Sequence, residues 1–138
     1  MVEMSEPAHL TDMAVDIGIE RGEWGQGKSS VYLIIDSKHC NKGGVAHGGL
    51  YTMMLDMSLG GALVSVLPKN EWCATTQLNI SFISAARPGE KITAKGNLVK
   101  RGRNVAHLEG RIVTESDRVV ATATGTWAIW DHKPASMS

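Results

Sequence analysis

The chain has 138 residues, of which 43% are hydrophobic and 20% are charged. These values are typical of a folded globular protein and exclude a mainly disordered chain. Fourteen basic residues balance fourteen acidic ones, so no overall field attracts nucleic acid or an anionic membrane. The length predicts a single domain over residues 1–138, with flexible termini at 1–12 and 131–138.

The charges are unevenly distributed along the chain. Residues 1–69 carry five Lys and Arg against eight Asp and Glu, whereas residues 70–138 carry nine against six. Lys100, Arg101 and Arg103 are clustered in the second half, and this cluster predicts a local site for an anion.

The cysteines and the N-terminus indicate in which cellular compartment the protein is located. Cys40 and Cys73 lack the close spacing of a zinc site or a redox pair, and two cysteines are too few for a disulfide framework. The N-terminus is acidic and has no apolar core segment, so it does not resemble a signal or transit peptide. No apolar run reaches membrane-spanning length. We therefore expect a soluble, cytoplasmic protein with reduced thiols and no membrane partner.

Two strands joined by a hairpin, and then a helix, are predicted in the first half. Residues 14–24 and 29–36 form the strands, and glycines at 25–28 supply the turn. A loop at 37–46 precedes a helix of about five turns that ends at Pro68. Its apolar stripe consists of Leu50, Met53, Met54, Met57, Gly60, Gly61, Val64 and Leu67. Gly60 and Gly61 each lower helix propensity by roughly 1 kcal/mol, which predicts that another backbone approaches closely there.

Beyond Asn70 the hydrophobic period changes to two, which is typical of strands with one buried face. We predict strands at 76–82, 92–98, 105–112 and 119–130, with turns at 87–90, 101–103 and 115–118. Two strands, one long helix and four strands make an α+β pattern. Because one helix must cover the apolar face of about five to six strands, the antiparallel sheet has to curl around it.

The run from Asn41 to Asp56 joins a glycine-rich loop to the start of the helix. His47, Gly48 and Gly49 open the helix, and Asp56 follows nine residues after His47. Nine residues amount to about two and a half turns and about 13 Å of rise, so the two side chains lie on opposite sides of the helix. If both act in one site, a second copy of the chain must supply one of them. The spacing therefore predicts a catalytic dimer.

Several motifs together resemble one known family. They are Asn41, His47-Gly48-Gly49 and Asp56, followed by Gln77-Leu-Asn79-Ile-Ser-Phe82, Arg87-Pro-Gly89, Lys100-Arg-Gly-Arg103 and Val120-Ala-Thr-Ala-Thr124. This set, spread over residues 30–128, resembles the PaaI-type hotdog-fold acyl-CoA thioesterases. The resemblance implies a curled sheet around the helix, a homo-oligomer that is a dimer or a dimer of dimers, and hydrolysis of an acyl-CoA or aryl-CoA to the free acid and CoA.

The start of the helix is suited to stabilising the oxyanion of such a reaction. N–H groups in the first helical turn have no partner within the helix and lie at the positive end of its dipole. Glycine has no Cβ, so a thioester oxygen can approach closely. We therefore expect the N–H of Gly48 to bind the oxyanion, a contribution of about 3 kcal/mol, and Gly49 to contact the substrate.

The resemblance implies roles for four further residues. Asp56 of one subunit acts as general base on a water or as the nucleophile, and both alternatives stay open. Asn41 of the other subunit orients the water, and His47 positions the loop or the carbonyl. A serine or threonine at the start of the next strand assists in this family, and Thr75, with Thr76 next to it, matches that position.

The CoA phosphates require basic side chains near the protein surface. Arg87, Lys100, Arg101 and Arg103 are the predicted contacts, and we expect their turns to be adjacent. The remaining histidines show no metal-like spacing, so we expect neither a metal nor a cofactor.

Two other functions share part of this pattern. A hotdog dehydratase for hydroxyacyl thioesters also joins a histidine and a carboxylate across a dimer, but its histidine lies well before the helix, whereas His47 opens the helix here. A non-catalytic acyl-CoA-binding module needs an output domain, for which we expect 138 residues to leave no room. The sequence does not specify the acyl or aryl group, and it leaves dimer and tetramer open.

Overall fold

The computed structural model describes residues 2–137. One long helix, six strands and three short helical segments follow one another along this part of the chain. Their bounds are α1 Asp12–Ile17, β1 Glu20–Gly25, β2 Lys28–Ile34, η1 Ser37–His39, α2 Gly48–Val64, β3 Trp72–Phe82, β4 Lys91–Arg101, β5 Val105–Thr114, β6 Val119–Trp130 and η2 Ala135–Met137.

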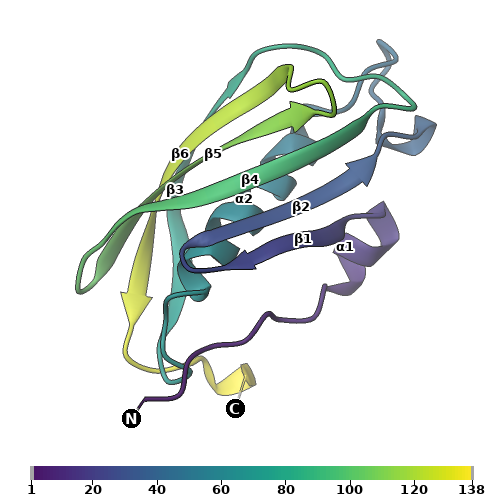
Figure 1. Ribbon diagram of the computed structural model, residues 1–138. Coiled ribbons are helices and arrows are strands. Elements are labelled where there is room, and N and C mark those ends of the chain that lie inside the picture. Colours follow the sequence, from purple (N-terminus) through teal and green to yellow (C-terminus); the bar gives the residue numbers. More distant parts are fainter. Residues whose placement is uncertain (1, 138) are drawn as a thin grey trace.

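The six strands form one sheet in the order β1-β2-β4-β5-β6-β3, and all neighbours are antiparallel. Figure 1 shows the sheet curving around α2. Strands β1 and β3 are the two edges of the sheet. The predicted α+β architecture, a curled antiparallel sheet around one long helix, is confirmed.

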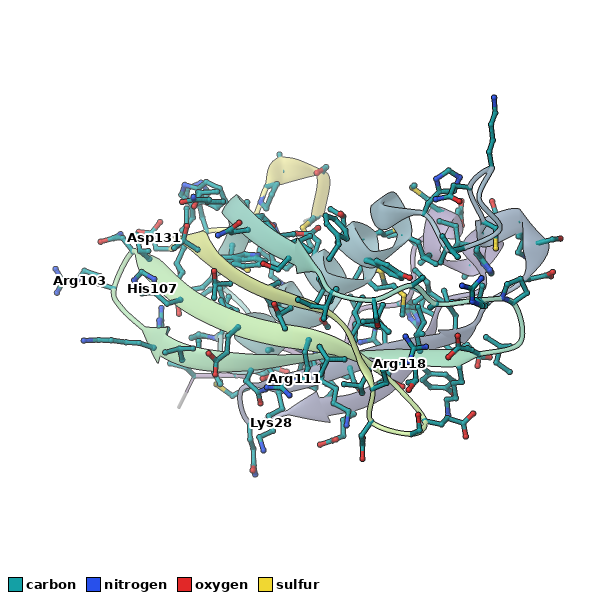
Figure 2. All side chains as sticks on the ribbon, turned by 90° about the horizontal axis from the view of Figure 1, so that it is seen from above. Lys28, Arg103, His107, Arg111, Arg118 and Asp131 are labelled. Atoms are coloured by element: carbon teal, nitrogen blue, oxygen red, sulfur yellow. The ribbon has the colours of Figure 1, made fainter. Side chains whose placement is uncertain are left out.

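The core lies between α2 and the inner face of the sheet. On the helix, Met54, Leu55 and Leu59 are fully buried, and they belong to one apolar cluster with Leu108 and Ile112 of β5. The outer-facing neighbours on β5 are exposed, and they include His107 and Arg111, which are labelled in Figure 2. The alternation predicted for this strand is therefore confirmed.

The prediction of a strand over residues 14–24 is wrong for residues 14–19. Residues 12–17 form the short helix α1, because the Thr11 side chain accepts a hydrogen bond from Ala14 N–H at one end and Gly18 adopts a left-handed conformation (φ 97°) at the other. Strand β1 then begins at Glu20. A capped turn this short has too few residues to show a helical period.

The long helix ends at Val64, before the Pro68 that was predicted to end it. Its buried face also differs from the predicted stripe, because Tyr51, Leu55 and Ala62 are buried while Met53 and Val64 are only half-buried. The sheet surrounds most of the helix, so apolar residues occur on nearly all sides of it. Spacing alone therefore could not identify the most buried face.

Gly60 and Gly61 are approached by side chains and not by the predicted backbone. A Cβ on Gly61 would lie 2.6 Å from Ser29 Oγ, and one on Gly60 would lie 3.4 Å from Trp127 Nε1. The close backbone contact of α2 is made instead by Gly96 of β4, where a Cβ would overlap the carbonyl of Ser58.

The segment before α1 is attached to the segment after α2. Ser5 N–H donates to Leu67 O (3.0 Å), Lys69 N–H donates to Glu3 O (2.8 Å), and the Lys69 ammonium pairs with the Glu3 carboxylate at 2.8 Å. The N-terminal segment therefore lies beside the segment that joins α2 to β3. Among residues 2–137, no helix combines the length and the apolar character that crossing a membrane requires.

Candidate active site

The N-terminus of α2 presents two glycine N–H groups. His47 precedes the helix with an extended backbone (φ −61°, ψ 141°), and Gly48 and Gly49 are its first residues. No acceptor among residues 2–137 binds the N–H groups of these two glycines. A Cβ on Gly48 would lie 3.1 Å from Cε1 of Phe82, whereas the position beside Gly49 is open. The helix therefore offers free donors at the positive end of its dipole.

Hydrogen bonds fix the loop that leads into this helix. His47 N–H donates to His39 O, and Ala46 N–H donates to Ala86 O, both at 2.9 Å. Ala86 N–H in turn donates to the buried Tyr51 hydroxyl at 3.2 Å, and burial raises the pKa of this hydroxyl. The segment after β3 thus holds both the loop and the first turn of α2.

Asn41 lies at the start of a tight turn within the same loop. Its Oδ1 accepts a hydrogen bond from Gly43 N–H (2.9 Å), and its backbone N–H donates to Val45 O (2.8 Å). Because Oδ1 is used within the turn, the amide NH₂ of Asn41 is the part of the side chain that remains for a water or a substrate.

His39 is a structural residue that the sequence did not reveal. Asp36 N–H donates to its Nδ1 (2.9 Å), so the ring proton is on Nε2, which donates to Ile17 O at 2.6 Å. This neutral, buried imidazole ties the loop to the end of α1. The signal for it is local, because Asp36 and His39 form a capping box around η1.

Asp56 and Thr75 form a carboxylate–hydroxyl pair. The Thr75 hydroxyl donates to Asp56 Oδ1 at 2.6 Å, and both residues are exposed. Asp56 lies in the middle of α2 and Thr75 near the start of β3. The structure therefore brings together two of the predicted catalytic residues, far from the His47 end of the helix.

A bulge in β3 turns Thr75 toward the helix. The register against β6 shifts between Thr75 and Gln77, and Thr76 instead binds the carbonyl and hydroxyl of Thr126. In a strand that alternates strictly, Thr75 would lie on the opposite face from the half-buried Leu78, which is the outer face. The extra residue of the bulge moves Thr75 to the inner face.

Two separate hollows flank α2 along the β3 edge. The first, about 270 Å³, lies beside Asp56 and Thr75 and is lined by Cys73 and three tryptophans, Trp24, Trp72 and Trp127. The second, about 400 Å³, lies beside Gly48 and is lined by Ala46, Tyr51, Phe82, Ile83, Ser84 and Ala85. Neither hollow contains both Asp56 and Gly48. Within one protomer the two groups therefore do not share a site, as their spacing along the helix predicted.

The predicted basic contacts do not lie on adjacent turns. Arg87 precedes β4, whereas Lys100, Arg101 and Arg103 lie at and beyond its other end. Eleven residues of strand span about 33 Å, so that prediction is wrong for one protomer. Arg101 also pairs with Glu71, while Arg103 projects from the tip of the β4–β5 turn (Figure 2).

Arg118 holds the segment after β3 and was missed by sequence reasoning. Its guanidinium donates to Ser84 Oγ (2.7 Å) and Ala85 O (2.8 Å) and pairs with Glu90 at 2.7 Å. The backbone N–H of Arg87 also donates to Glu90, and these contacts lower the pKa of the Glu90 carboxyl. Arg118 thereby supports the segment that binds Ala46 and Tyr51.

We expect the Cys73 thiol to be unreactive although it lies in the same hollow as Asp56. Burial, and then the Asp56 carboxylate, raise the pKa of Cys73 to about 11. At pH 8 about one thiol in a thousand is then ionised, and the thiolate is the reactive form. Iodoacetamide at pH 8, followed by mass spectrometry, should leave Cys73 unmodified in the folded protein and label it in urea.

The raised pKa of Cys73 also determines whether the protein becomes more or less stable as the pH rises. The folded state keeps the Cys73 proton above pH 8.5, where an unfolded thiol loses it. The stabilisation is therefore complete below pH 8.5 and is lost as the pH rises toward 11. Labelling of the folded protein at the rate of a free thiol would contradict this environment for Cys73.

The fold and this site define a hotdog-fold thioester hydrolase. The chain belongs to the thioesterase superfamily, whose sequence profile matches residues 43–121. A Pseudomonas aeruginosa protein whose name gives it as a candidate esterase is 35% identical over 97 residues, 70% of this chain and 72% of that protein.

Solved structures share the fold. The Escherichia coli PaaI protein of the phenylacetic acid degradation operon superposes with a TM-score of 0.79 at 19% identity, over 86% of this chain and 83% of that one. A Streptococcus pneumoniae thioesterase protein, solved with coenzyme A, gives 0.79 at 24% identity, over 88% and 94%. The family match and these neighbours, which include a PaaI protein, support the PaaI-type hotdog thioesterase that the motifs resemble.

Proposed function

We propose that the protein hydrolyses an acyl-CoA or aryl-CoA thioester to the free acid and CoA. The observation that carries the proposal is the Asp56–Thr75 pair, which lies beside a cavity on the same sheet edge as the free N–H groups of Gly48 and Gly49. The coenzyme A in the structure of the Streptococcus pneumoniae relative supports CoA as the leaving group.

In this proposal the Thr75 hydroxyl holds one oxygen of Asp56, and the other oxygen acts on the substrate. It takes a proton from a water that adds to the thioester carbon, or it attacks that carbon itself. The carbonyl oxygen gains negative charge and accepts a hydrogen bond from Gly48 N–H. The C–S bond then breaks, and when Asp56 is the general base, the proton it took passes to the sulfur, so that CoA leaves as a thiol. When Asp56 is the nucleophile, a water protonates the leaving CoA thiolate, and the resulting hydroxide hydrolyses the mixed anhydride on Asp56 to release the acid. The Asn41 amide orients the water, and His47 positions the carbonyl.

We infer that a dimer assembles this site through the free edge of β3. Thr75 lies near one end of β3, and Phe82, which packs on Gly48, lies at the other. If two β3 strands pair antiparallel about the midpoint between Leu78 and Asn79, Thr75 of one copy lies opposite Phe82 of the other. Asp56 then faces Gly48, His47 and Asn41 of the second copy. The pairing also covers Phe82 and Ile83, which are 59% and 57% exposed.

The same dimer places the predicted CoA contacts together. Arg87 lies at the Phe82 end of its protomer, next to the segment that binds the helix start, while Lys100, Arg101 and Arg103 lie at the Trp72 end. Antiparallel pairing of β3 brings the Trp72 end of one copy to the Phe82 end of the other. We propose that the CoA phosphates bind there. Tetramer formation and a cytoplasmic location stay predictions.

The test is a panel of acyl-CoA and aryl-CoA thioesters assayed for release of free thiol. We expect at least one to be hydrolysed with a kcat/KM of about 10⁴ M⁻¹s⁻¹ or more, the usual range of enzymes. A hydroxyacyl thioester converted to an enoyl thioester without thiol release would indicate a dehydratase. Saturable binding of every ester without hydrolysis would indicate a binding module.

A further inference from the structure

The cavity beside Asp56 contains an unused hydrogen-bond donor. Trp127 on β6 is only 2% exposed, and no acceptor among residues 2–137 binds its indole N–H. Some side-chain nitrogen and oxygen atoms of residues 2–137 have no contact with solvent. Where such an atom belongs to a residue that is not exposed, it always has a hydrogen-bond partner. Trp127 Nε1 is therefore not sealed, and it opens onto the cavity that Trp127 lines.

The position of this donor is fixed by Gly60. Trp127 Nε1 lies 3.4 Å from the place where a Cβ on Gly60 would be, and apart from the two residues next to Gly60 and the backbone of this part of α2, no atom lies closer to that place. Gly60 is four residues after Asp56, so the donor lies about 6 Å further along the helix axis than the carboxylate. A substrate whose carbonyl is held at Asp56 would thus meet the indole N–H about one helical turn deeper.

The other walls of the cavity are mainly apolar. Trp24, Val31, Met57 and Val64 line it, and Gly60 and Gly61 leave room along α2. Residues 8–11 of the N-terminal segment also line it, and the Arg21 guanidinium binds the carbonyl of Ala8 there. The volume is about 270 Å³, compared with about 150 Å³ for an apolar cavity that binds benzene. A ring with a small substituent therefore fits.

A buried indole N–H usually has a hydrogen-bond partner. We infer, on the basis of the proposed function, that Trp127 determines specificity by donating a hydrogen bond to an oxygen carried by the acyl group. The acyl group is then flat and largely apolar, and its oxygen lies about one helical turn beyond the thioester carbonyl. A site with such a donor discriminates against a substrate that lacks the acceptor.

The test uses two pairs of CoA esters, and the members of each pair differ only by an oxygen in place of a methylene group. One pair is 4-methoxyphenylacetyl and 4-ethylphenylacetyl, and the other is the corresponding 3-substituted pair; the methoxy oxygen accepts but does not donate a hydrogen bond. We expect kcat/KM to favour the methoxy ester of one pair by about fivefold. Trp127→Phe should reduce this ratio to near one. Trp130→Phe, on the same strand but outside the cavity, should retain it.

A second variant keeps the test valid if Trp127→Phe does not fold. Gly60→Ala places a methyl group at 3.4 Å from Trp127 Nε1, where the substrate oxygen would have to lie. Alanine favours the helix more than glycine does, so the melting temperature should rise by a few degrees. The preference for the methoxy ester should nevertheless be lost.

The outcomes separate this inference from the proposed function. Binding of the same esters to an Asp56→Ala variant, measured by calorimetry, should show the same preference without turnover. If the esters are hydrolysed but neither pair shows a preference, or the preference survives both variants, the role of Trp127 is overturned and the thioesterase stands. If no thioester of the panel is hydrolysed by the wild type, the proposed function itself fails.

Discussion

Replacing Asp56 by Ala should lower kcat for CoA thioester hydrolysis by about a thousandfold or more and leave the protein folded. In the proposed mechanism the carboxylate takes the proton from water or attacks the carbonyl, so its loss removes the reacting group itself. Asp56 is exposed and contacts Thr75 at the surface of α2. Its removal therefore changes the free energy of unfolding by no more than about 0.5 kcal/mol. Thiol release and urea unfolding measure the two effects.

A matched pair of threonine variants tests the geometry around Asp56. Thr75→Val keeps the shape of the side chain but removes the hydroxyl that holds Asp56 Oδ1. Thr76→Val removes a hydroxyl that binds Thr126 instead. We expect the first variant to lower kcat by about tenfold, a typical cost of losing one positioning hydrogen bond to a charged group, and the second to leave it unchanged. An Asp56→Ala enzyme with wild-type turnover on its best substrate would reject the assignment.

The sheet and the long helix could be predicted because each spans several periods of its own pattern. The final strand was predicted at 119–130, as the structure has it, since alternating threonines and apolar residues continue without interruption. The short helix α1 could not be predicted in this way. Its six residues are held by a cap at Thr11 and a left-handed Gly18, and these local bonds outweigh the strand-like composition of 14–17.

The proposed catalytic residues were only partly predictable from the sequence. Helix geometry alone predicts that His47 and Asp56 lie on opposite sides of the helix. Thr75, however, reaches Asp56 only because of the bulge at Thr76, and a period-two pattern places it on the wrong face. The resemblance to the family located this residue where physical periodicity did not.

Contacts between distant elements account for the rest of the site. The approach of Trp127 to Gly60 joins β6 to α2, and the anchoring of Ala85 by Arg118 joins two segments that are 33 residues apart. No local pattern encodes these distances, because they depend on how far the sheet curls. The same reason explains the basic residues, whose turns were expected to be adjacent although the length of β4 separates them.

Mixing two inactive variants should restore activity if the site lies between subunits. The partner of Asp56→Ala is Gly48→Pro, which removes the proposed oxyanion donor. Proline is tolerated at the first position of a helix, and the extended backbone of His47 (φ −61°, ψ 141°) is the conformation that a residue before proline prefers. Gly48→Pro alone should lower kcat by about 10² to 10³. Gly48→Ala, which adds the same Cβ beside Phe82 but keeps the N–H, should lose far less.

In an equal mixture, half of the dimers contain one chain of each variant. If Asp56 acts with Gly48 of the other chain, each mixed dimer has one site with both defects and one intact site. Co-expression of the two variants, followed by a thiol-release assay on the unselected mixture, should then give about a quarter of the wild-type activity per chain, and mixed dimers isolated with two affinity tags should give about half. If both groups acted within one chain, no intact site would form, and the mixture would be as inactive as either variant alone.

The double variant, Asp56→Ala with Gly48→Pro, mixed with wild-type chains makes the converse control. With sites between subunits, both sites of a mixed dimer carry one defect, so only the wild-type dimers work and about a quarter of the activity remains. With sites inside each chain, the wild-type member of every mixed dimer would still work and about half would remain. Sites between subunits raise the activity of the first mixture and lower that of the second, compared with sites inside each chain. The reason is that α2 of each chain contributes its Asp56 to one site and its Gly48 to the other. Restored activity in the first mixture therefore cannot come from variants that merely fold poorly.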